Sequence, residues 1–177
     1  MTIMVLELKA PHGPEWEVLQ PLLPGDLAYV MSYAYLGIYW SNHHHMMHAT
    51  DHVDGKVLLA NTHLLFWLSL IPFVTSWMAE NHFASVPTAL YGVVLLLSAL
   101  AYSLLKRAIV AHHGPQGRLV QAVGKDRKGK ISIVAYAAAI PLAFVQVRFA
   151  VVIFVLVALL WLVPDSRIEK NMGDEHA

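Results

Sequence analysis

Three long stretches without a charged residue, and a fourth that contains a single one, dominate this sequence of 177 residues. A helix that crosses the hydrocarbon layer of a membrane needs roughly 20 consecutive, mostly apolar residues. The first three stretches meet that requirement, at about 27–48, 57–79 and 86–105. The whole chain is 57% hydrophobic and 14% charged, whereas soluble domains carry about 25% charged residues. The sequence therefore predicts an all-α integral membrane protein that lies in a lipid bilayer.

The fourth apolar stretch, at 131–163, is interrupted only by Arg148. As a single helix it would be about 50 Å long, which is too long for a hydrocarbon core of about 30 Å. We therefore predict two shorter spans, at about 131–146 and 149–163, joined by a turn at 146–148. Together with the first three stretches, this makes five complete transmembrane helices.

Basic residues gather in one connection, 106–130, which holds seven of the twelve Lys and Arg residues. Loops rich in Lys and Arg stay in the cytoplasm. With this loop inside, Lys56 and the polar tail at 165–177 are also inside, and only Lys9 and Arg148 carry positive charge outside. We therefore predict a multi-pass protein of the cell inner membrane, whose basic loop and C-terminus are cytoplasmic.

The first eight residues, MTIMVLEL, have membrane-like sequence but would form a helix only about 12 Å long, less than half of a bilayer. A polar, proline-rich external loop follows at 9–25, and the membrane domain then occupies 26–164. Residues 1–8 therefore resemble the outer end of a helix whose inner half is absent. Our hypothesis is that Met1 is an internal methionine and that the natural product starts upstream.

A histidine cluster closes the first apolar stretch, in the sequence SNHHHMMHATDH at 41–52. On a helix, His44, His48 and His52 share one face because they are four residues apart. Imidazole is a common ligand of zinc, copper and iron, so a membrane metal-binding protein that uses the His43–His52 cluster is one hypothesis. Histidines at a membrane border also form hydrogen-bond networks or sense pH, and a membrane di-iron enzyme would need several separate clusters. We therefore predict no metal and keep the metal site as the alternative.

Other function classes find little support in the sequence. The chain has no cysteine, which excludes disulfides and thiol catalysis. It has no nucleotide-binding, hydrolase or phosphate-cradling motif, so we expect neither an enzyme nor a cofactor. Its basic residues lie in loops and do not form a stripe on a folded face, so we expect no nucleic-acid partner. No charge lies deep in a complete span, which argues against ion-coupled pumping.

Several motifs are familiar: TIMVLELKAP, YLGIYWSNHHHMMH, ANTHLLFWLSLIPFVTSWM and LWLVPDSRIE. They resemble the prokaryotic members of the potassium channel family of transmembrane protein 175, and the resemblance covers nearly the whole chain. It implies six transmembrane helices per subunit and a homotetramer that conducts K⁺ through a central pore lined by the first helix. Residues 1–8 would then be the remnant of that first helix.

The resemblance also implies roles for individual residues. Thr2 matches a layer of threonine hydroxyls in the pore, and Leu6, one turn further out, would also line it. Trp40, His43 and His44 resemble residues that bind to the inner half of the first helix and support it. The family's signature of an arginine followed by Phe-Ser-Asp at the start of that helix is missing here. A truncated, non-conducting member of the family is therefore a further alternative.

Overall fold

The computed structural model describes residues 22–48, 50, 53–113 and 127–162, together with residues 8, 10, 15, 17, 19 and 20. These residues form five helices and no strand: α1 (Leu23–His48), α2 (Gly55–Glu80), α3 (Ser85–His113), α5 (Arg127–Val145) and α6 (Val147–Leu162). The predicted all-α fold is confirmed for this part of the chain.

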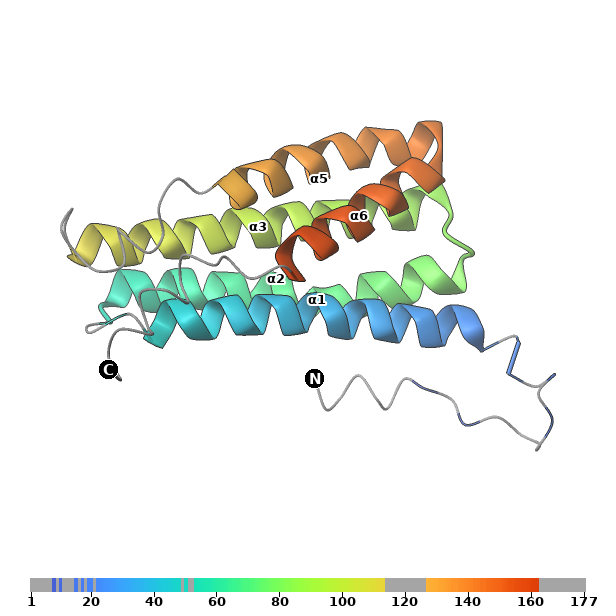
Figure 1. Ribbon diagram of the computed structural model, residues 1–177, viewed down its shortest axis with the longest axis horizontal. Coiled ribbons are helices and arrows are strands. Elements are labelled where there is room, and N and C mark those ends of the chain that lie inside the picture. The colour runs from blue at the N-terminus through green and yellow to red at the C-terminus, as the bar shows by residue number, and fades with distance from the viewer. Residues whose placement is uncertain are drawn as a thin grey trace, which may run out of the picture.

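The helices form a bundle in which each one packs against the next along the chain (Figure 1). α3 lies at the centre, because it packs against α2 on one side and α5 on the other and also touches α6. α1 packs chiefly against α2, and it meets α6 over a short length only. α1 is therefore a peripheral helix with much of its surface turned away from the bundle.

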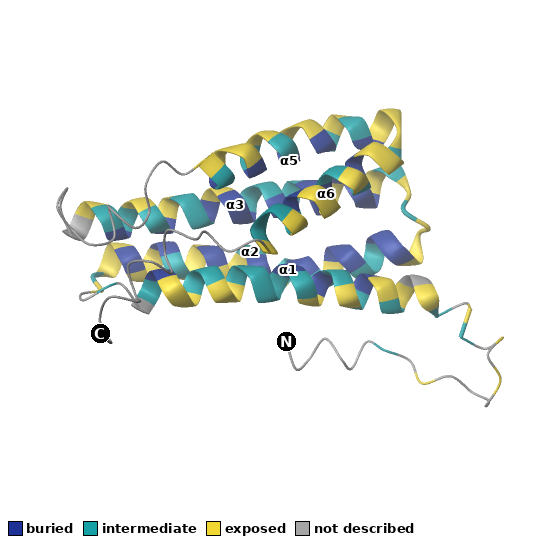
Figure 2. Ribbon diagram, viewed as in Figure 1, coloured by how far each residue is buried: buried dark blue, intermediate teal, exposed yellow. Residues whose placement is uncertain are grey.

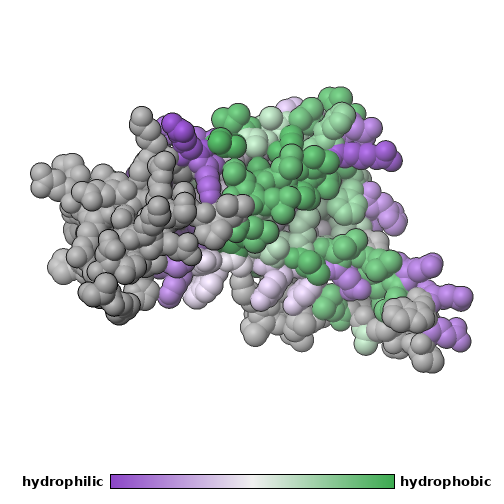
Figure 3. Space-filling view, in the orientation of Figure 1, coloured by the Kyte–Doolittle hydropathy of each residue, from purple (hydrophilic) through white to green (hydrophobic). Residues whose placement is uncertain are grey.

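Three helices are long and apolar enough to cross a membrane: α2, α3 over Ser85–Ala111, and α5. α6 is apolar but has only 16 residues, and α1 contains tyrosines, an asparagine and histidines that make it less apolar. Large apolar side chains are exposed on the outside of the bundle (Figure 2), among them Leu59, Phe66, Phe73, Val145 and Leu156. Figure 3 shows hydrophobic side chains over α5 and α6, with hydrophilic ones at either end of that area. The protein is therefore a membrane protein.

The structure corrects the predicted basic loop at 106–130, because both of its ends are helical. α3 continues to His113, and α5 begins at Arg127. Lys and Arg are good helix formers, so the first charge after an apolar stretch indicates the membrane border and does not end the helix. Residues 114–126, the middle of the predicted loop, lie outside the described residues.

The turn between the last two helices is also shorter than predicted. Only Gln146 separates α5 from α6. Its amide donates to the Leu142 carbonyl at 2.8 Å, and its own carbonyl accepts from the Phe149 amide at 3.0 Å. The turn therefore keeps helix-like hydrogen bonds on both sides, and Arg148 belongs to the first turn of α6.

Aromatic side chains join the helices at the centre of the bundle. The buried Tyr35 hydroxyl on α1 donates a hydrogen bond of 2.5 Å to the Phe154 carbonyl oxygen on α6. The Tyr91 ring on α3 meets both residues edge to face, with centroids 6.1 Å from Tyr35 and 5.1 Å from Phe154. Such aromatic pairs stabilise packing beyond the area that they bury. α1, α3 and α6 are therefore connected through this aromatic cluster.

A hydrogen-bonded cap sets the start of α2 beside the end of α1. The Asp54 carboxylate accepts from the Val57 amide at 2.8 Å, as an N-cap residue does. At the end of α1, the Thr50 hydroxyl donates to the Met46 carbonyl at 2.9 Å. These bonds order the two helix ends that approach one another, and so fix the level at which residues of α2 face α1.

We predict that Gly92→Ala lowers the stability of the protein. A Cβ atom at Gly92 would lie 3.2 Å from both Ile140 Cγ1 and Phe154 Cζ, so α5 and α6 would have to shift. Overpacking of this kind costs about 1–3 kcal/mol. Gly37 is the matched control, because a Cβ there would meet nothing within 4 Å and alanine gains about 1 kcal/mol in helix propensity.

Thermal unfolding in detergent measures both variants. The expected order of midpoint temperatures is Gly92→Ala below the unchanged protein, and Gly37→Ala equal to it or above it. An equal or higher midpoint for Gly92→Ala would show that α3 does not approach α5 and α6 as closely as the structure indicates.

Candidate functional site

Three aromatic side chains of the predicted site come together on the last turns of α1. Trp40, His43 and His44 are three and four residues apart, so they share one side of the helix. The Trp40 ring stacks on the His43 ring at a centroid distance of 6.3 Å and an angle of 28°. It stacks on His44 at 6.4 Å and 25°. The three rings therefore form one local cluster, which we call the Trp40 cluster.

A hydrogen bond to α2 holds this cluster in place. His43 Nε2 lies 2.6 Å from Asn61 Oδ1. An amide oxygen only accepts hydrogen bonds, so Nε2 is the donor. Asn61 sits in the second turn of α2, at the level that the Asp54 cap sets. The orientation of the His43 ring, and through it that of Trp40, is therefore tied to the position of α2.

The Trp40 cluster faces away from the bundle. The Trp40 side chain is 63% exposed, and His44 is exposed as well. The same side of α1 carries further exposed apolar side chains towards its start, namely Leu23, Leu27, Val30 and Tyr33. Among the residues that the structure describes, nothing covers this side of α1. In a membrane protein, such a row of apolar side chains contacts either lipid or another helix.

Other predicted site residues are not placed by the structure. Thr2 and Leu6 lie outside the described residues, as does His52, and of His48 only the backbone is described. The alternative metal site therefore has one described side chain, that of His44. Within the described ranges, no three or more His, Cys, Asp or Glu side chains lie close enough together to hold a metal ion.

A second pair of histidine and tryptophan lies on α2 alone. Trp67 Nε1 donates to His63 Nε2 at 2.9 Å, and the two residues are four apart on the same helix. This bond stiffens one surface of α2 but joins no other helix. It differs in that respect from the bond between His43 and Asn61, which connects two helices.

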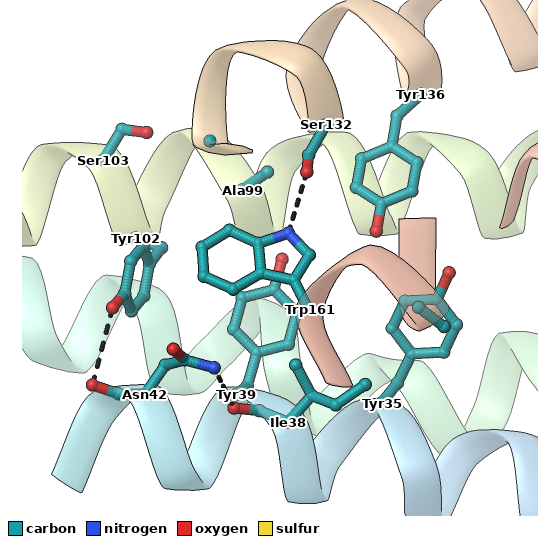
Figure 4. A pocket seen from close by; sticks show the side chains of 12 residues that line it. Tyr35, Ile38, Tyr39, Asn42, Ala99, Tyr102, Ser103, Ser132, Tyr136 and Trp161 are labelled. Atoms are coloured by element: carbon teal, nitrogen blue, oxygen red, sulfur yellow. Dashed lines mark hydrogen bonds between the residues drawn. The ribbon is translucent and has the colours of Figure 1, made fainter. Parts of the chain in front are cut away.

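A small cavity of about 20 Å³ lies on the opposite side of α1 (Figure 4). Four helices contribute its lining: Tyr35, Ile38, Tyr39 and Asn42 from α1, Ala99, Tyr102 and Ser103 from α3, Gly129, Ser132 and Tyr136 from α5, and Ala158 and Trp161 from α6. The end of α1 thus carries the Trp40 cluster on one side and cavity residues on the other.

Sequence reasoning missed both Asn61 and the cavity. Asn61 is a single polar residue within an apolar stretch, and no pattern distinguishes it from a packing residue. The sequence contains a weak indication of the cavity, since Tyr35, Tyr39 and Asn42 recur at helical spacing on α1. Their partners on the other helices could not be identified without the fold.

Comparison with known proteins shows which protein family the chain resembles. Residues 1–72 match the family model that describes the endosomal/lysosomal potassium channel TMEM175. A potassium channel of Chryseobacterium sp. (strain P1-3) is 48% identical over 174 residues, which span 98% of this chain and 91% of that protein. A potassium channel of Streptomyces collinus is 30% identical over 113 residues, or 59% of this chain and 55% of that protein.

The fold has a counterpart among solved structures. The crystal structure of a lysosomal potassium-selective channel TMEM175 homolog from Chamaesiphon minutus superimposes with a TM-score of 0.72. The match covers 90% of this chain and 87% of that chain, at 24% sequence identity. The predicted resemblance is therefore confirmed, and the chain belongs to the TMEM175 potassium channel family.

Proposed function

We propose that this protein is a subunit of a potassium-permeable cation channel that conducts passively through the central pore of a homotetramer. One observation supports this proposal above the others. The chain is 48% identical, over 98% of its length, to a protein that is named a potassium channel. K⁺ is then the permeant ion, and the protein acts as a channel and not as an enzyme.

The outer part of the proposed pore is lined by residues 1–8 of each subunit. Thr2 supplies a ring of hydroxyl groups, and Leu6, one turn further out, supplies an apolar ring. A partly dehydrated K⁺ ion passes these rings, and the width and hydroxyl lining of the pore favour K⁺ over other cations. No energy source is needed, because the ion moves down its electrochemical gradient.

In this proposal the Trp40 cluster supports the pore-lining helix. Trp40 is exposed and faces away from the bundle, so it is available to a helix that packs on α1. His43 is bonded to Asn61, so the cluster has a defined orientation on a two-helix base. Support of this kind keeps the pore-lining segment at one distance from the axis, and the pore width depends on that distance.

The proposed orientation follows the basic residues. The charged end of α3, the start of α5 and the C-terminus face the cytoplasm, and the subunit spans the cell inner membrane several times. The Trp40 cluster is then at the cytoplasmic side of the membrane, beside the inner part of the pore.

We predict K⁺ flux in liposomes that contain the purified protein. A K⁺ gradient should drive uptake that is faster than Na⁺ uptake under the same gradient, and a chelator such as EDTA should leave it unchanged. Empty liposomes treated with a K⁺ ionophore are the control for vesicle integrity. An assembled oligomer without K⁺ flux would favour the non-conducting alternative. Loss of flux on chelation, with stoichiometric zinc, iron or copper by elemental analysis, would favour the metal-binding alternative.

We predict that Thr2→Val weakens the selection of K⁺ over Na⁺. Valine has nearly the shape of threonine but no hydroxyl group, so it removes oxygen ligands from the pore and keeps its width. The measurement is the ratio of K⁺ to Na⁺ flux. The matched control is Thr62→Val on the exposed surface of α2, which should leave the ratio unchanged. A ratio for Thr2→Val equal to that of the unchanged protein would remove Thr2 from the proposed pore.

We predict that His43→Ala and Asn61→Ala each reduce K⁺ flux about fivefold, because each removes a hydrogen bond with a net contribution of about 1 kcal/mol. The double variant should lose no more than either single variant, since both act through the same bond. His63→Ala, which removes the bond to Trp67, is the matched control and should conduct normally. Equal K⁺ flux in the unchanged protein, the two single variants and the double variant would contradict a supporting role for the Trp40 cluster.

A further inference from the structure

The cavity beside α1 lies next to the last described turn of α6. α6 ends at Leu162, whereas α3 continues from Ser103 to His113, about 15 Å further along its axis. α1 also continues past the cavity, from Asn42 to His48. Figure 1 shows both helices extending past the end of α6. The cavity is therefore at the level of the last described turn of α6, and the described parts of α1 and α3 extend further.

The cavity has a closed floor and an open mouth. Tyr35, Ala99 and Tyr136 are buried and form part of the floor, whereas Tyr39 and Trp161 at the mouth are half-buried. Figure 4 shows the Trp161 ring among the side chains of Tyr39, Tyr102 and Ser132. The cavity is therefore only partly enclosed, and its less buried lining residues lie on α1, α3 and α6.

The inner walls are apolar although they are built from tyrosine and tryptophan. The Tyr35 hydroxyl donates to the Phe154 carbonyl at 2.5 Å, and Trp161 Nε1 donates to the Ser132 hydroxyl at 2.8 Å. Because these polar groups already have partners, the side chains present their ring surfaces to the cavity. Its volume of about 20 Å³ accommodates one group of the size of a water molecule. A methyl or methylene group fits these walls better than water does.

Basic residues lie beside the cavity on α3 and α5. Five basic residues lie within one helical turn of a cavity-lining residue, at the end of α3 and the start of α5: Lys106, Arg107, Arg127, Lys128 and Lys130. Figure 3 shows hydrophilic side chains gathered where α5 begins, and the first amides of α5 add partial positive charge there. The four lining helices contain one carboxylate, that of Asp26, and it lies in the first turn of α1, far from the cavity.

We propose that the cavity and its basic rim bind one anionic phospholipid from the bilayer. One acyl chain lies along the mouth between α1 and α6 and places a methylene-sized segment inside. The headgroup phosphate lies against Arg107 and Arg127. An apolar cavity with a cationic rim matches both parts of such a lipid, and basic pockets between transmembrane helices are known to bind anionic headgroups. The lipid would contact α1 on the Tyr39 side, opposite Trp40.

Titration of delipidated protein in detergent tests this proposal, with bound lipids counted by native mass spectrometry. We expect one phosphatidylglycerol per chain to bind more tightly than phosphatidylcholine. The double variant Arg107→Gln, Arg127→Gln should bind phosphatidylglycerol about thirtyfold more weakly and phosphatidylcholine as before. Arg148→Gln, at the opposite end of α6, is the matched control and should bind like the unchanged protein.

A second pair of variants tests the apolar part of the site. Ala158→Phe fills the mouth and should abolish tight binding, whereas Ala138→Phe, on the exposed side of α5, should not. Equal binding of both lipids, or unchanged binding in the double arginine variant, would overturn the proposal. So would displacement of the lipid by inorganic phosphate, since the rim would then be a simple anion site. None of these measurements uses ion flux, so their outcome is independent of the proposed channel activity.

Discussion

The hydrogen bond from the Tyr35 hydroxyl to the Phe154 carbonyl oxygen holds α1 to α6, and the two residues are 119 positions apart in the chain. In a bilayer, apolar side chains move between two apolar environments when helices associate, so their burial drives association only weakly. Close packing and hydrogen bonds between helices contribute more. α1 packs otherwise mainly on α2, so this bond, together with the ring contacts of Tyr35 with Tyr91 and of Tyr39 with Tyr102, orients α1 against the rest of the bundle. The Trp40 side and the cavity side of α1 both depend on that placement.

The end of α1 separates two chemically different surfaces. Trp40 faces outwards and is stacked on two histidines, whereas Tyr39 and Asn42 face a small cavity. These residues are neighbours in sequence, and a helix turns neighbours by about 100° from one another. A shift of α1 caused on one side is therefore transmitted to the other side through a rigid element. In the proposed channel, this arrangement gives a physical route by which a molecule in the cavity alters the support of the pore-lining helix.

Hydropathy predicted the positions of the described helices well but their ends poorly. The spans were read from charges, so the prediction stopped one helix at Lys106, although α3 continues to His113. Membrane borders depend on the transfer of charge from water to lipid, whereas helix ends depend on backbone hydrogen bonds, and lysine and arginine continue a helix readily. Similarly, three residues were assigned to the turn where Gln146 alone is sufficient, because its backbone bonds both helices.

The sequence by itself determined that the protein is helical and that it lies in a membrane. These properties depend on composition and on the helical repeat, which are local. Only the tertiary structure decided that Asn61 is the partner of His43, that Tyr35 bonds to α6 and that four helices surround a cavity with a basic rim. Such contacts join residues from 18 to 119 positions apart, and the periodicity of one helix contains no information about which residue of another helix lies opposite.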